Sequence, residues 1–106
     1  MAFNEINEYP RGRYYKSDLT NTADTVVATG TPVRLSGVVV SGGAAAEIVI
    51  FRATDDTPEY FRVHIPANTT LYLPIRAFLE DGLEVLTATS AGDVGVTVFY
   101  FAPSQV

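Results

Sequence analysis

His64 is the single histidine of the sequence and the first residue whose chemistry could support catalysis. It lies in an alternating run, residues 59–65, where it shares one face with Tyr60 and Arg62. A catalytic base needs a nucleophile and an orienting group within hydrogen-bond reach, and no G-x-S-x-G motif accompanies this histidine. One histidine without any cysteine is also a poor zinc site. We therefore expect a histidine on a surface strand, no enzyme activity and no zinc.

Two groups of acidic residues supply the carboxylates that a calcium ion would need. Oxygen ligands on a loop suit calcium, yet neither group has the alternating spacing of an EF-hand. Paired carboxylates could also serve glycoside hydrolysis, but no signature of a cleft accompanies them. Acids that solvate turns are the commoner case, so we expect neither a metal ion nor a cofactor. The two groups are Asp55, Asp56 and Glu59, and Glu80, Asp81 and Glu84.

The N-terminal segment, residues 1–24, is the part best suited to binding a partner. It holds three of the seven basic residues and three of the six tyrosines, and Pro10 and Gly12 disfavour a helix, so we expect an extended arm. Its bases can pair with an acidic surface while its aromatic rings fill pockets. Stacking on nucleic acid is an alternative that the net charge of −5 opposes, and a frayed terminus is another. The expected partner-binding residues are Phe3, Tyr9, Arg11, Arg13, Tyr14, Tyr15 and Lys16.

Short runs rich in β-branched residues, separated by turn residues, follow the arm. About seven strands at this spacing are typical of an antiparallel β-sandwich or jelly roll, which predicts an all-β domain at residues 25–106. Residues 76–79 are expected to form one helical turn. Because the arm is expected to lie outside the domain, removing residues 1–23 should leave the β fold intact. The strands are expected at 25–29, 32–40, 46–52, 59–65, 70–75, 83–89 and 94–101.

Two of these strands carry apolar side chains on both faces. In the last strand, valines alternate with Phe99 and Phe101, and in the third, Val49 and Phe51 alternate with isoleucines. Such a strand needs cover on both sides, and the opposing sheet supplies only one. The second cover can be the arm folded back, a loop or a neighbouring subunit, and the small size of the domain favours the subunit. We therefore expect a homo-oligomer whose interface contains Ile48, Ile50, Phe99 and Phe101.

The composition narrows the class of protein further. Hydrophobic residues make up 47% and charged residues 18%, which is typical of a folded chain rather than a disordered one. There is no cysteine, so neither disulfides nor thiolate chemistry contribute, which fits folding in a reducing cytoplasm. The N-terminus lacks the pattern of a signal peptide, and no apolar run approaches the roughly 20 residues that span a bilayer. We expect no membrane partner.

Five segments together carry a resemblance to a known family. They are VRLSGVVV at 33–40, SGGAAA at 41–46, EIVIFR at 47–52, FLEDGLEV at 78–85 and VGVTVFY at 94–100. In this arrangement, residues 25–101 resemble the small β-sandwich virion proteins of tailed bacteriophages. The resemblance implies a capsid decoration (cement) protein on the capsid surface that forms homo-oligomers, often trimers, binds the major capsid protein and has no catalytic residues.

The 24-residue arm departs from that family pattern. It leaves open a second hypothesis, a module of the phage tail or fibre that binds a carbohydrate or a receptor. Tyr60 and Tyr72 are the exposed rings that we expect such a module to use.

Overall fold

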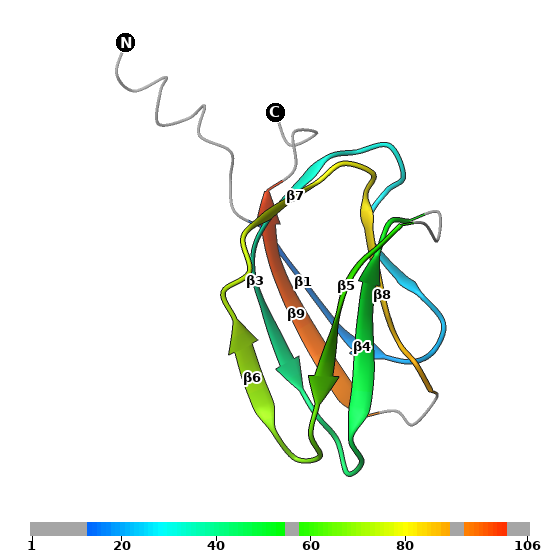
Figure 1. The fold of residues 1–106 in the computed structure, drawn as a ribbon, viewed down its shortest axis with the longest axis vertical. Helices are drawn as coiled ribbons and strands as arrows, with labels where there is room; N and C mark the ends of the chain where they lie inside the picture. Colours follow the sequence, from blue (N-terminus) through cyan, green and yellow to red (C-terminus); the bar gives the residue numbers. More distant parts are fainter. Residues whose placement is uncertain (1–12, 55–57, 90–92, 102–106) are drawn as a thin grey trace.

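The computed structural model describes residues 13–54, 58–89 and 93–101, which form a sandwich of two antiparallel sheets (Figure 1). Sheet A has the strand order β1-β9-β3-β6, with β7 also paired to β3, and sheet B has the order β2-β8-β4-β5. This confirms the predicted all-β sandwich. The strands are β1 (Arg13–Leu19), β2 (Asp24–Val27), β3 (Val33–Ser41), β4 (Glu47–Arg52), β5 (Glu59–Ile65), β6 (Thr70–Leu73), β7 (Ala77–Leu79), β8 (Leu83–Thr87) and β9 (Val94–Phe101).

The core lies between the two sheets and follows the period-two alternation of the strands. Figure 1 shows β1, β9 and β3 side by side in one layer and β4, β5 and β8 in the other. Phe51 of β4 is fully buried and stacks on Phe61 of β5, with ring centroids 4.5 Å apart. The described residues contain no helix that is long and apolar enough to cross a membrane. The largest fully buried side chains are Phe51, Leu19, Leu35, Ile65, Leu83, Val33, Val38, Val40, Val49, Val85, Val94 and Val96.

The described part of the predicted arm is extended, as expected, but it belongs to the sandwich. Residues 13–19 form β1, which pairs along its whole length with β9, and Leu19 is only 1% exposed. The Ser17 hydroxyl donates a hydrogen bond to Asp24 Oδ2 at 2.6 Å, which ties β1 of sheet A to β2 of sheet B. The sandwich therefore begins at Arg13 and not at residue 25.

The helical turn expected at residues 76–79 is wrong. Residues 77–79 form the short strand β7, which pairs antiparallel with the start of β3. Leu79 lies opposite Val33 and is buried with it, while Phe78 points outward between two inward-facing residues. Burial of Leu79 in the core makes the extended conformation the stable one, since a single helical turn gains little by itself.

Candidate interaction surface

His64 lies on β5, opposite Ile48 of β4, and its side chain is exposed as expected. The neighbouring carboxylate belongs to Glu47, whose two oxygens accept hydrogen bonds from the Ile48 N–H at 2.9 Å and from the Thr89 hydroxyl. Glu47 thus acts as an internal acceptor at the end of sheet B. The depression beside it measures about 440 Å³ and is lined by Ala46, Glu47, Ile48, His64, Ile65, Pro66, Ala88 and Thr89.

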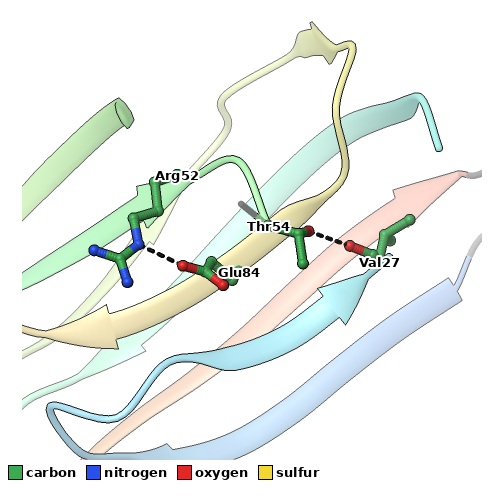
Figure 2. A network of polar contacts seen from close by, with 4 residues as sticks. All are labelled: Val27, Arg52, Thr54 and Glu84. Carbon is green, nitrogen blue, oxygen red and sulfur yellow. Dashed lines mark hydrogen bonds and ion pairs between the residues drawn. The ribbon is translucent and has the colours of Figure 1, made fainter. Parts of the chain in front are cut away.

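Glu84 is buried on the outer side of sheet B, where a carboxylate requires a partner. Figure 2 shows that Arg52 of β4 reaches it, and the Arg52 Nε donates to Glu84 Oε2 at 2.5 Å. Nearby, the Thr54 hydroxyl donates to the Val27 carbonyl at 2.6 Å (Figure 2). The first contact joins β4 to β8 and the second joins the segment after β4 to the end of β2, so both stabilise sheet B.

Two further acids of these groups, Asp81 and Glu59, also have structural partners. Asp81 Oδ1 accepts a hydrogen bond from the Gly30 N–H at 2.8 Å, which joins two turns. Two hydrogen bonds from Arg62 lower the pKa of Glu59 from its ordinary value, although the pair is exposed. Among the residues that the structure describes, no three potential ligand side chains converge as a metal site. Asp55 and Asp56 lie outside the described residues.

Sheet A presents the exposed large apolar side chains of the described sandwich, and all of them lie on its outer face. Tyr14 is 69% exposed, Tyr72 61%, Phe78 62% and Phe99 39%. They come from four different strands, β1, β6, β7 and β9, that the topology places in one sheet. We call these four residues the aromatic face. A concentration of exposed rings of this kind marks an interaction site, whereas a single exposed ring does not.

The strand register explains how the rings of the aromatic face come together. Tyr14 is the Cα partner of Phe99, and Phe99 is in turn the partner of Gly37. The Tyr72 hydroxyl lies 3.1 Å from the point where a Cβ of Gly37 would stand, so the Tyr72 ring leans over this glycine. Three rings therefore form a row across β1, β9, β3 and β6, because the missing side chain of Gly37 leaves room for the last of them.

The charged residues beside the aromatic face are mostly basic. Lys16 and Arg34 are exposed on the outer side of sheet A, and Asp18 is the acidic residue on β1 of the same side. The strands of sheet A thus expose no excess of described acids on this side, although the net charge of the chain is −5.

The four residues predicted for the oligomer interface lie on opposite sides of the sandwich. Phe99 and Phe101 face outward from sheet A, whereas Ile48 and Ile50 are half-buried on the outer side of sheet B. The prediction that β4 and β9 carry apolar groups on both faces is confirmed. A single flat contact, however, cannot cover all four residues.

The structure places only part of the predicted partner-binding set. Tyr14 and Lys16 are exposed on the outer side of β1. Arg13 and Tyr15 lie in the same strand by their backbone. Phe3, Tyr9 and Arg11 fall outside the described residues.

Tyr60 is not the exposed ring that the carbohydrate hypothesis expected. It is half-buried, and its hydroxyl accepts a hydrogen bond from the Asp81 N–H at 3.2 Å and donates one to the Gly82 carbonyl at 3.0 Å. Tyr72 is exposed as expected. Sequence reasoning missed Phe78, which points outward between the inward-facing Ala77 and Leu79, because this three-residue strand is too short to show alternation.

Comparison with known proteins supports the fold. No protein-family model matches the chain, and no curated protein matches it. A solved structure of Bacillus endospore appendages, described as disulfide-linked pili, aligns with a TM-score of 0.54 at 13% identity and covers 89% of this chain and 87% of that one.

Capsid structures of infectious bursal disease virus show a looser likeness. The Gx strain aligns with a TM-score of 0.33 at 13% identity, and the VP2 subviral particle with 0.36 at 14%. The alignments cover 92% of this chain but only 32% and 34% of the viral ones, so the chain spans about a third of their length. Likeness at this level does not bear on function.

Proposed function

We propose that the chain is a non-enzymatic structural protein of a tailed-phage virion, where it decorates the capsid. In this proposal it forms a homo-oligomer and binds the major capsid protein on the capsid surface. The phage role comes from the resemblance of residues 25–101 to small virion sandwich proteins. The observation that supports association is the aromatic face, because rings exposed by 39–69% in one sheet favour burial against a partner.

The same fold occurs in a protein of pilus-like endospore appendages, which is compatible with a subunit of an assembly. Those pili are described as disulfide-linked, and this chain has no cysteine. This sequence therefore cannot form the disulfides by which those pili are described as linked. Contacts that are weak in a single copy can still hold the protein on a capsid, because linked copies bind many sites at a high effective concentration.

The N-terminal segment is the part of the chain that we propose contacts the major capsid protein. Residues 1–12, which contain Phe3, Tyr9 and Arg11, directly precede β1, the edge strand of sheet A, in the sequence. Bases and aromatic rings in succession suit an acidic surface with apolar pockets. Contacts that cross the boundaries between capsid subunits would add buried area there and would resist the pressure of packaged DNA.

Co-sedimentation with capsids that lack the protein tests this role. The full chain is expected to pellet with the capsids and to saturate, and a chain without residues 1–12 is expected to bind at least about tenfold more weakly, the loss of a few anchoring contacts. All nine described strands begin after residue 12, so this variant retains the sandwich. The Arg62→Glu variant, changed at an exposed residue of sheet B, is the matched control. Failure of the full chain to bind would reject capsid decoration, and undiminished binding of the shortened chain would reject the N-terminal segment as the contact.

A carbohydrate-binding module of the tail is the second candidate, and the exposure of Tyr72 in a row of rings favours it. Flat rows of aromatic rings can stack on the apolar faces of sugars. Saturable binding in a glycan screen that is lost in Tyr72→Ala, together with no binding to capsids, would favour this candidate over decoration.

A further inference from the structure

We infer that the aromatic face packs against the same face of a second copy, around a two-fold axis that runs parallel to the strands between β9 and β3. This inference rests on the proposed function, since it names the surface through which the proposed homo-oligomer forms. A two-fold contact uses one patch twice, so the patch must be complementary to itself. The register of sheet A allows this to be checked residue by residue.

Rotation about this axis places β1 of one copy opposite β6 of the other, and β9 opposite β3. Cross-strand partners form rows, and rows at the same level along the strands then face each other. Two sheets that stack face to face with nearly aligned strands have this arrangement. Phe99 faces Gly37 of the second copy, and with it the Tyr72 ring that leans over this glycine. Phe99 therefore meets the Tyr72 ring, which fills the space that the missing side chain of Gly37 leaves.

The next row of residues is also complementary. It consists of Lys16, Thr97, Val39 and Tyr72, which are successive partners across β1, β9, β3 and β6. The axis places Lys16 opposite Tyr72, where an ammonium group can lie over a ring, and Thr97 opposite Val39. In the following row Asp18 lies opposite Thr70. Among the side chains that the structure describes in sheet A, no row brings two charges of the same sign together.

Charge also favours this face as the contact between copies. Two chains of net charge −5 repel each other on approach. Along the strands of sheet A the described exposed charges are Lys16, Arg34 and Asp18, so this contact does not bring a cluster of acids together.

The exposed area is sufficient for a contact of modest size. A large aromatic side chain presents about 150–250 Å² when fully exposed, so the four rings present on the order of 350–550 Å² between them. A standard interface buries about 800 Å² on each partner. The rings thus supply roughly half of that area, and Val39, Phe101 and the stems of Lys16 and Arg34 lie beside them on the same side.

Sedimentation equilibrium of the full chain tests the inference. We expect twice the chain mass at micromolar concentration, and Phe99→Glu is expected to weaken the association at least about 30-fold, the loss typical of a central interface residue. Phe99 is exposed, so this variant retains the core, and an unchanged circular-dichroism spectrum checks that it folds. The His64→Glu variant, which adds the same charge at an exposed residue of sheet B, should leave the mass unchanged. A monomer or a trimer at all concentrations, or a Phe99→Glu chain that still dimerises fully, would overturn the inference.

Crosslinking tests the arrangement itself, because a chain without cysteine allows clean single-cysteine variants. Asp18→Cys and Thr70→Cys chains are mixed, left to exchange subunits and treated with a short bismaleimide. We expect crosslinked pairs in the mixture and few in either variant alone, since like positions lie three strand spacings apart across the axis. Efficient crosslinking of either variant with itself would contradict the two-fold geometry. A dimer that does not bind capsids would reject decoration but not this contact, and a monomer that binds them would reject the contact and the proposed homo-oligomer but not decoration.

Discussion

A chain that lacks residues 1–19 is expected to be unfolded, whereas a chain that lacks only residues 1–12 is expected to fold. The longer deletion removes β1 and with it Leu19, which is 1% exposed in the core. Loss of one buried leucine side chain alone costs about 2–5 kcal/mol. The deletion also opens the edge of β9 and uncovers its buried valines. Because a domain of this size is stable by only about 5–15 kcal/mol, losses of this kind can remove the folded state.

Circular dichroism and thermal unfolding of the two shortened chains check this expectation. The chain without residues 1–12 serves as the control, because it retains every described strand. If the chain without residues 1–19 unfolds at the same temperature as this control, β1 contributes nothing to stability, and the N-terminal segment is the separable arm that the sequence suggested.

Replacement of Gly82 by alanine is the substitution from which we expect the second large effect. Gly82 has φ +74° in the turn between β7 and β8, and its Cβ would lie 2.4 Å from the Ala28 carbonyl oxygen and 2.4 Å from the Thr54 hydroxyl. Its N–H also donates to the Thr31 carbonyl at 2.8 Å, so the turn cannot move away freely. An alanine at this φ strains the backbone by about 1–3 kcal/mol, and the close contacts of its Cβ with the two oxygens add a similar cost. We expect the free energy of unfolding to fall by roughly 2–5 kcal/mol in urea titration.

Gly30 provides a matched control for this substitution. It has a similar φ of +81°, but a Cβ there would meet no atom within 4 Å. The free energy of unfolding of Gly30→Ala should therefore fall by only about 1–2 kcal/mol, which is the cost of the left-handed backbone conformation for a residue with a Cβ. Equal losses at the two glycines would mean that the close contacts around Gly82 are not present in solution.

The alternation of polar and apolar residues was sufficient to predict the sandwich and the faces of its longest strands. Val96 and Val98 are buried opposite an exposed Phe99, and Arg62 and His64 are exposed on β5, as their spacing indicates. These features depend on the period of a single strand, which is local information.

The features that the sequence did not predict depend on which strands become neighbours. Residues 13–19 are polar enough to be taken for an arm, and only the open edge of β9 makes them a strand. Phe78 lies in a segment too short to show alternation, and its direction is set by pairing with β3. The aromatic face joins side chains from β1, β6, β7 and β9, so it exists only once the strand order is known.

Hydroxyl-radical footprinting with mass spectrometry tests most directly the central claim, that the chain assembles through the outer side of sheet A. Oxidation rates are compared between the assembled protein and a dilution at which it dissociates. We expect Tyr14, Tyr72 and Phe99 to be protected in the assembly, while the exposed His64 on sheet B reacts equally in both states. Equal rates for the three aromatic residues, with protection at His64 instead, would contradict the account.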